Sequence, residues 1–442
     1  MSEVSTVLLI AVAAPLLLGF AVICLREPLR VALPVYTALI PFGGLVSLGS
    51  SPFSSASSLL GLLLGAGLTA QLMAGRRLAP RLSAAVPVWT VFLGLAAATT
   101  LWTINRSVTL LGLAVLASLV LVFLLVAISD VDRSIVRRTE SALLLGSSIA
   151  ILYGFYQLLF QGGLADDSGG IEQGGRFGNG MLGPNILAVT LLIPFAIALN
   201  RAFNPRDPGR QLPNSALAAL MLSGVLMTGS RTGTLGAGIV VVVMIVAFPR
   251  GGRRGLGAAL VVGALATVLV WTLHPLGLAE RTFASATSSS GRLDIWEVGL
   301  AACADYCGIG SGWGTFPDVY AATQATVPGA RVLTGEEGSY QPHNLWLLAV
   351  VELGIAGLLL LTIGLAVSLY QAFKLPPEFR PAAVGSTAGL IIGVFFLSSM
   401  EFKMFWLALM LVALYRNVAT AEEIAARSAR RTSSTTPDAA ET

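Results

Sequence analysis

Charged side chains are scarce in this 442-residue chain. Only 11% of its residues are Asp, Glu, Lys or Arg, whereas 55% are hydrophobic. An ordinary soluble domain carries roughly 25% charged residues, and a chain this poor in charge cannot cover a water-exposed surface. The apolar residues are gathered into long runs, so we predict an all-α polytopic protein whose main solvent is the lipid bilayer.

Histidine and cysteine are also rare, with two and three residues respectively. No CxxC pair or Cys/His cluster is present, so we expect neither a metal ion nor another cofactor. Cys24 lies in an apolar run and predicts only packing. A disulfide between Cys303 and Cys307, four residues apart on an expected helix, would be strained, so we favour free thiols there. The basic residues form no polybasic tract, which argues against nucleic-acid binding.

Apolar runs long enough to span a bilayer recur along the chain, since a spanning helix needs about 20 mostly apolar residues. We expect twelve or thirteen spans in one transmembrane domain at residues 1–420 and a disordered tail at 421–442. The first run is expected to be retained, because no basic signal-peptide segment precedes it. The thirteen candidates are Val4–Cys24, Val31–Leu48, Leu59–Ala74, Ala84–Trp102, Val108–Ile128, Ser141–Phe160, Pro184–Asn200, Ser215–Gly229, Gly233–Phe248, Gly255–Leu273, Leu345–Tyr370, Ala382–Ser399 and Met404–Tyr415.

Lysine and arginine are distributed unevenly between the two sides that the alternating loops define. Twenty of the 27 fall on one side, which the positive-inside rule makes cytoplasmic. The N-terminus is then outside and the C-terminus cytoplasmic. The outer side disfavours basic residues, so those found there need a reason; they are Arg106, Arg176, Arg231, Arg281, Arg292, Arg331 and Lys403.

Two outer segments are too long to be simple turns. Gln161–Gly183 is Gly-rich and acidic, and the large outer loop, 274–343, is longer still. Within that loop, Gly291–Tyr306 is expected to form a helix with Trp296 among the side chains of its apolar face. Long ordered loops in compact proteins tend to be functional.

Two outer arginines are candidates for binding an anion. Arg231 occupies a short turn, Ser230-Arg231-Thr232-Gly233, and Arg292 opens the helix of the large outer loop. A guanidinium suits phosphate and diphosphate because its planar fork donates two parallel charge-assisted hydrogen bonds. The alternative for each is an interfacial arginine that reaches lipid headgroups.

A histidine and a glutamate are the other candidates. His343 lies where the large outer loop returns to the membrane, and neutral imidazole can accept a proton from a hydroxyl near neutral pH. Its alternative is a histidine bonded to the backbone of a helix start. Glu352 lies inside the next apolar run, where a carboxylate either has a functional role or only orients a neighbour or caps a polar cavity. His274 is most simply an interfacial residue.

Two further motifs imitate sites of other enzyme classes. Asp130-Val131-Asp132 has the DxD pattern of metal-binding sugar transferases but lies among cytoplasmic arginines, so we interpret it as loop charge. The Gly308–Gly314 run resembles a nucleotide-binding glycine loop. Because it follows no strand, we interpret it as a closely packed turn.

Taken together, the outer-face motifs resemble the O-antigen ligase and polymerase superfamily of membrane glycosyltransferases, in order and spacing, over about residues 172–355. The N-terminal spans share only hydropathy with it. Ligases of this family are usually drawn with twelve spans and both termini inside, in contrast to the topology expected here. The segments that carry the resemblance are Phe177-Gly178-Asn179 with Gly183-Pro184-Asn185, Ser230-Arg231-Thr232-Gly233, Gly291-Arg292 with Trp296, Gly308–Gly312, and His343-Asn344-Leu345 with Glu352 and Gly354.

The resemblance implies a metal-independent, inverting transfer of a glycan from undecaprenyl diphosphate or a similar polyprenyl diphosphate carrier to an acceptor hydroxyl. The acceptor would be a lipid A-core, wall polymer or other glycan, at the outer face of the bacterial inner membrane. Arg231 and Arg292 would stabilise the diphosphate leaving group, and His343 would be the general base. Arg176 would be a further donor-binding residue. The supporting residues would be Asn185, Asn344 and Glu352.

Other functions stay open on the sequence. A polysaccharide repeat-unit polymerase uses the same donor chemistry, so these motifs do not separate it from a ligase. A lipid-linked glycan flippase or other transporter would more usually place ionisable residues near the bilayer midplane, and a purely structural scaffold would not explain the large outer loop. The transferase interpretation predicts that Arg231, Arg292 and His343 converge within about 10 Å in a cavity open to lipid.

Overall fold

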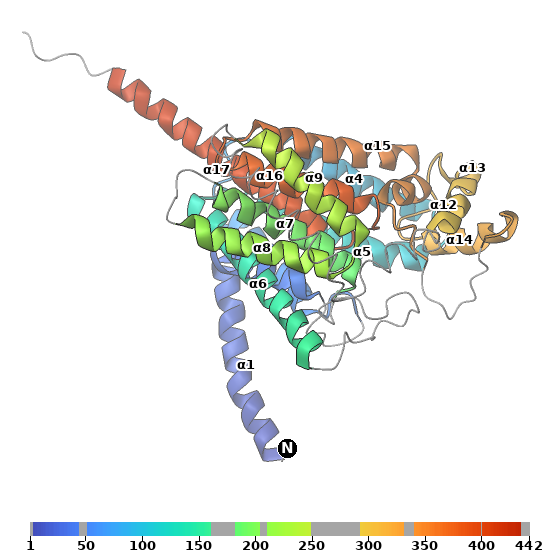
Figure 1. Ribbon diagram of the computed structural model, residues 1–442, viewed down its shortest axis with the longest axis horizontal. Helices are drawn as coiled ribbons and strands as arrows, with labels where there is room; N and C mark the ends of the chain where they lie inside the picture. The colour runs from blue at the N-terminus through green and yellow to red at the C-terminus, as the bar shows by residue number, and fades with distance from the viewer. Residues whose placement is uncertain are drawn as a thin grey trace, which may run out of the picture.

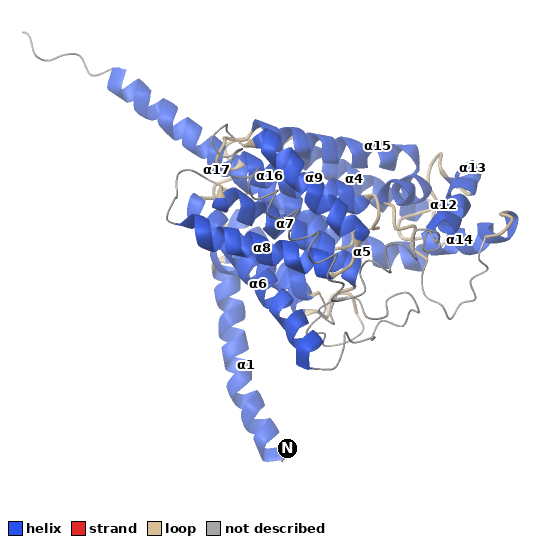
Figure 2. Ribbon diagram, in the orientation of Figure 1, coloured by secondary structure: helices blue, strands red, loops and turns tan. Residues whose placement is uncertain are grey.

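The computed structural model describes residues 3–43, 51–160, 182–203, 210–248, 292–330, 340–398 and 400–434. Over these ranges the chain is helical apart from loops and one isolated bridge between Leu78 and Ser129 (Figures 1 and 2). The helical segments are α1 (Glu3–Arg26), η1 (Pro28–Ala32), α2 (Leu33–Leu39), η2 (Ile40–Phe42), α3 (Ala56–Met73), α4 (Ala85–Ala98), η3 (Thr99–Leu101), α5 (Arg106–Ile128), α6 (Arg133–Phe160), α7 (Pro184–Ala202), α8 (Gln211–Met227), α9 (Arg231–Ala247), α12 (Arg292–Ala301), α13 (Cys303–Tyr306), α14 (Phe316–Thr323), η5 (Gln324–Thr326), α15 (Leu345–Lys374), α16 (Arg380–Val394) and α17 (Lys403–Ser434).

The surface of this helical bundle is apolar. Leu121, Leu152, Val246 and Leu359 each leave half or more of their area exposed. In water such a surface would aggregate, whereas in a bilayer it contacts lipid tails. Among the described helices, α3, α5, α7, α15 and α17 are long and apolar enough to cross a membrane. The prediction of an all-α polytopic membrane protein is confirmed.

The candidate spans coincide with helical segments wherever the structure describes them, with three differences in detail. The span expected at Val31–Leu48 is instead a π-helical turn, a short α-helix and a 3-10 turn, each with a proline at its start, because proline removes the backbone donor that a continuous helix needs. Helix α6 begins at Arg133 rather than Ser141, and α17 continues as helix through Ser434. The tenth candidate, Gly255–Leu273, lies outside the described residues.

Helix α7 is the centre of the bundle, where it packs against α8, α9 and α16. Glycines allow the close approach, as small residues commonly do between membrane helices. A Cβ added at Gly236 would lie 2.6 Å from the Leu192 side chain, and one at Gly389 would lie 3.1 Å from it. The contacts fix α9 and α16 against the same side chain of α7.

One end of the bundle, which we call the α12 end, gathers the starts of several helices beside α12, α13 and α14 (Figure 1). Contacts between distant segments establish the arrangement. Trp346 at the start of α15 stacks on Phe395 after the end of α16, with ring centroids 4.1 Å apart. The other contacts at this end join Gly393 of α16 to Val189 of α7, Gly233 of α9 to Ala188 of α7, and Thr190 of α7 to Met404 of α17.

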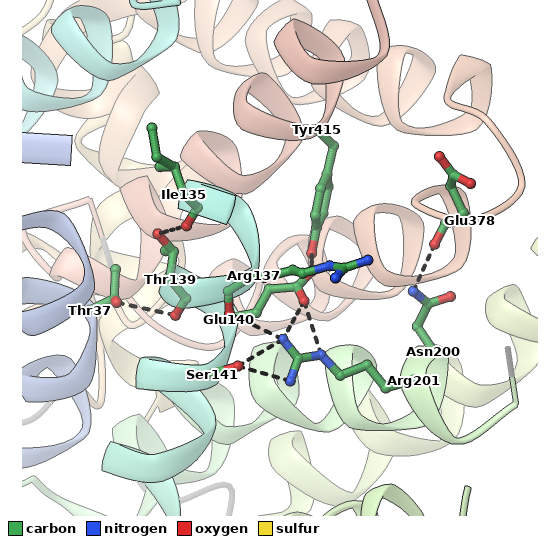
Figure 3. Close-up of polar contacts among 10 residues, drawn as sticks. All are labelled: Thr37, Ile135, Arg137, Thr139, Glu140, Ser141, Asn200, Arg201, Glu378 and Tyr415. Carbon is green, nitrogen blue, oxygen red and sulfur yellow. Dashed lines mark hydrogen bonds and ion pairs between the residues drawn. The ribbon is translucent and has the colours of Figure 1, made fainter. Parts of the chain in front are cut away.

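The opposite end, which we call the arginine end, is joined by a network of buried and half-buried polar side chains (Figure 3). Arg201 of α7 pairs with Glu140 of α6, with 2.6 Å between nitrogen and oxygen. The second carboxylate oxygen of Glu140 accepts a hydrogen bond from Tyr415 of α17 at 2.6 Å. Asn200 donates to the backbone oxygen of Glu378, ahead of α16, at 2.9 Å. The network fixes these helices relative to one another, because losing one partner would strand a charge in a poorly solvated place.

The Gly308–Phe316 segment, which joins α13 to α14 and which we call the latch, binds to α15 around a kink. Gly354 inside α15 has φ 69° and ψ −171°, which interrupts the helical hydrogen-bond ladder. The freed carbonyl oxygens of Val351 and Glu352 accept from the latch N–H groups of Ser311 and Gly312, at 2.9 and 3.0 Å. The latch therefore completes the backbone pairing that the kink leaves open.

The Glu352 side chain also connects α15 to the latch. Its carboxylate is buried and accepts hydrogen bonds from the backbone N–H groups of Gly314 and Phe316, both at 2.9 Å. On its other side the latch contacts the α4–α5 connection, where Ile104 donates to the Ser311 carbonyl at 3.0 Å and Asn105 donates to Asp318 at 3.2 Å. The expectation of a closely packed turn at the glycine run is confirmed.

We predict that Gly310→Ala weakens the latch and that Gly308→Ala does not. Gly310 has φ +88°, and a Cβ there would lie 2.3 Å from the Glu352 backbone oxygen, whereas a Cβ at Gly308 meets nothing within 4 Å. The strained backbone and the clash should cost about 1–3 kcal/mol. The thermal midpoint of the purified protein measures this, and equal midpoints for the two variants would contradict the latch.

Candidate functional site

His343 lies just before α15 in a conformation that side-chain-bearing residues rarely adopt. Its φ is +48°, and among the described residues it is the one non-glycine residue with positive φ. Such strain persists only where surrounding structure imposes it. The next residue, Asn344, caps α15 by accepting from the Leu347 N–H at 3.0 Å. The helix start therefore does not need the imidazole, which makes no hydrogen bond to the described part of the chain.

Trp296 of α12 holds the backbone next to His343. Its indole N–H donates to the carbonyl oxygen of Pro342 at 2.7 Å. Arg292 lies four residues before Trp296 and therefore on the same face of α12. This one hydrogen bond ties the face of α12 that carries Arg292 to the peptide that precedes His343.

The sequence analysis placed Trp296 on an apolar helix face and among the residues that carry the family resemblance, but it gave Trp296 no role at the site. The indole N–H of Trp296 was the signal that could have indicated such a role. An indole N–H in a packed position usually finds an acceptor.

The electrostatics of this pair keep His343 neutral. Burial and, second, the positive charge of Arg292 lower the pKa of His343 to about 4. At neutral pH the imidazole is therefore uncharged and has a nitrogen free to accept a proton. Arg292 lies close enough to influence this titration, so the structure brings two of the predicted site residues together.

Glu352 has a different role from His343. Both of its carboxylate oxygens are engaged by latch N–H groups. Of the two interpretations that the sequence left open, the geometry favours the one in which this carboxylate orients a neighbouring segment. By fixing the latch it fixes α13 and α14, which flank the His343 segment.

Arg231 and Asn185 lie at the starts of α9 and α7, at the same α12 end. Ser230 caps α9 by accepting from the Gly233 N–H at 3.2 Å, and a Cβ at Gly233 would lie 2.5 Å from that of Ala188, three residues after Asn185. The Ser-Arg-x-Gly turn is thus pressed against the first turn of α7, with the Arg231 side chain exposed.

The structure places these residues in two neighbouring groups. Arg292 and His343 form one group, and Arg231 and Asn185 form the other, joined through the contacts of α16 at the α12 end. Convergence of both arginines on His343 within about 10 Å stays a prediction. Arg176, His274, Arg281 and Arg331 lie outside the described residues.

The expectation of free thiols at Cys303 and Cys307 is wrong. The two cysteines form a disulfide, with their Cα atoms 4.4 Å apart. One turn of the short helix α13 separates them, which brings their Cα atoms to the lower end of the range that a disulfide accepts. The carbonyl of Cys307 also accepts from the Ile355 N–H of α15 at 2.9 Å, so the disulfide adjoins the latch. Cys24 is free and buried, as expected.

The comparison with protein families supports the resemblance. A family described as O-antigen ligase matches residues 216–362, about a third of the chain. This stretch contains Arg231, Arg292, His343 and Glu352 and ends within α15, while Asn185 precedes it. No curated protein matched the chain. Residues 216–362 of this chain are thus similar to the O-antigen ligase family, which supports the resemblance that the outer-face motifs carry.

Proposed function

We propose that this protein transfers a glycan from a polyprenyl diphosphate carrier to an acceptor hydroxyl, as a ligase, at the outer face of the bacterial inner membrane. The match of residues 216–362 to the O-antigen ligase family implies a glycosyltransferase-type activity on lipid-linked glycan and acceptor substrates in general. The observation that carries the more specific proposal is the pairing of Arg292 with a neutral His343 that has no hydrogen-bond partner among the described residues.

The diphosphate binds between Arg292 and Arg231 in this proposal. Charge develops on the leaving diphosphate as the glycosidic bond breaks, and two guanidinium groups stabilise that charge without a metal ion. The N-termini of α7 and α9 add favourable partial charge at the same end of the bundle. Arg176, from the preceding segment, adds a third contact to the donor.

His343 accepts the proton of the acceptor hydroxyl, which attacks the sugar carbon from the face opposite the diphosphate and inverts it. A pKa of about 4 makes the imidazole available but only weakly basic. A bound diphosphate offsets the charge of Arg292, which is one of the two causes that lower this pKa. Donor binding therefore raises the basicity of His343 when the base is needed. Asn344 and Asn185 support the site from the first turns of α15 and α7, and Glu352 does so through the latch.

Two observations support an extracytoplasmic orientation of the α12 end. The arginine-rich loops lie at the opposite end, as the positive-inside rule requires of a cytoplasmic face. The disulfide between Cys303 and Cys307 lies at the α12 end, and disulfides persist in oxidising compartments.

We predict that purified protein given a lipid-diphosphate glycan and an acceptor releases free carrier diphosphate and forms one glycosylated product. His343→Ala should reduce the release about 10²–10⁴-fold, the usual contribution of a general base. His274→Ala, which changes the only other histidine, is the matched control. Transbilayer movement of intact donor without release would indicate a flippase, and a ladder of growing lipid-linked chains would indicate a polymerase.

The pH dependence of kcat/KM provides a second prediction. Protonated imidazole cannot accept a proton, so activity should be complete near neutral pH and should fall as the pH drops through about 4. Arg292→Gln removes a charge that lowers the pKa of His343, so the acid limb should move to higher pH. Arg231→Gln should slow the reaction and leave the limb in place. An unshifted limb in Arg292→Gln would rule out the pairing.

Trp296→Phe tests the positioning of the pair. It removes the hydrogen bond to Pro342 and should lower kcat about 10- to 100-fold with a smaller effect on KM, because misplacement of a catalytic group acts on the chemical step. Trp313→Phe is the matched control, since the buried Trp313 indole has no hydrogen-bond partner in the described part of the chain. Equal loss in both variants would indicate a packing effect only.

A further inference from the structure

A polar cavity of about 620 Å³ lies at the arginine end, far from the α12 end. It forms where the end of α1, η1, the end of α3, the α5–α6 connection and α17 meet. Its lining includes the Asp130-Val131-Asp132 motif, which the proposed transferase reaction does not use. The charged residues that line it are Glu27, Arg30, Arg76, Asp130, Asp132, Arg133 and Glu422.

Some of these charges are already used by the fold. Arg133 pairs with Glu422, and one terminal guanidinium nitrogen of Arg133 lies 2.7 Å from a carboxylate oxygen of Glu422. Asp132 accepts from the Ser134 hydroxyl at 2.6 Å and from the Ile135 N–H at 2.9 Å, and so caps the start of α6. These groups stabilise the walls of the cavity.

Charges of both signs remain available. Within the described ranges, the carboxylates of Glu27 and Asp130 make no hydrogen bond or ion pair. Arg30 acts on Asp132 only through its charge, and Arg76 bonds the neutral Gln71 side chain. A ligand that pairs with all of these remaining charges therefore offers a hydrogen-bonding cation and an anion together.

The surroundings of the cavity are apolar. Leu25, Met73 and Leu78 each lie within a few residues of lining residues in the chain, and they expose 38%, 85% and 53% of their area. A small soluble zwitterion would leave this apolar rim unused. A lipid would place its headgroup among the charges and its acyl chains along α1 and α3.

We propose that this cavity binds the headgroup of a phospholipid with a primary ammonium beside its phosphate, the chemistry of phosphatidylethanolamine. The ammonium donates to Glu27 and Asp130, and the phosphate accepts from Arg30 and Arg76. A choline headgroup has no N–H to donate, and a purely anionic headgroup leaves both carboxylates unmatched. In the described part of the chain, no group of three His, Cys, Asp or Glu residues is arranged to hold a metal ion instead.

The test is lipid binding by the full-length, delipidated protein, followed by native mass spectrometry and by the thermal midpoint. The probes are phosphatidylethanolamine, phosphatidylcholine and phosphatidylglycerol with matched acyl chains, and soluble glycerophosphoethanolamine. We expect phosphatidylethanolamine to bind at least about tenfold more tightly than the others, the factor that one charge-assisted hydrogen bond supplies. Equal binding of the choline lipid, preference for the anionic lipid, or equally tight binding of the free headgroup would overturn the proposal.

Substitutions locate the binding site. Asp130→Asn and Arg30→Gln should each weaken phosphatidylethanolamine about tenfold, and the matched control Arg138→Gln, an exposed arginine at the same end, should not. The thermal midpoint without lipid shows whether each variant is folded. If the Asp130→Asn variant is unfolded, the Arg30→Gln variant still tests the site, because Arg30 is exposed. Unchanged lipid binding in a folded Arg30→Gln variant would contradict the site.

Discussion

The architecture of the site depends on one buried carboxylate. Glu352 is 1% exposed, inside a membrane helix, and a carboxyl group in such a place is tolerated only with hydrogen-bond partners. The N–H groups of Gly314 and Phe316 supply them. The same latch segment also satisfies the backbone acceptors that the kink at Gly354 frees. The latch, a loop between short helices, is thereby packed into the membrane bundle. This contact holds α12 beside the start of α15.

The two ends of the bundle differ in how their polar side chains are paired. The α12 end holds several helix starts, the exposed Arg231 and the neutral His343, whose backbone has a positive φ. At the arginine end, the polar side chains mostly satisfy one another, as Glu140 does with Arg201 and Tyr415. The cavity beside Asp130 is the exception there, since part of its charge has no partner in the described protein. The proposed transfer site and the proposed lipid headgroup site thus lie at opposite ends of the same helices.

Sequence alone predicted the helices well because a helix that spans a bilayer requires a long apolar run. Such a run can be recognised in the sequence without knowing which helices pack against it. It also singled out Arg292 and His343, since a basic residue on the outer side and a lone imidazole at a membrane entry point stand out locally. It failed where the decisive partner is distant in the chain. The bond from Trp296 to Pro342 and those from Glu352 to the latch join segments 36 or more residues apart. The disulfide was missed for another reason: Cys303 and Cys307 were expected on a continuous helix, whereas α13 is a single turn.

The central claim is that Arg231 and Arg292 bind one diphosphate beside His343. A cryo-electron microscopy structure of the protein with bound polyprenyl diphosphate tests it most directly. The account predicts phosphate density contacting both guanidinium groups, with the His343 imidazole facing the position of the sugar carbon. Density that contacts neither arginine, or that lies at the opposite end of the bundle, would contradict it.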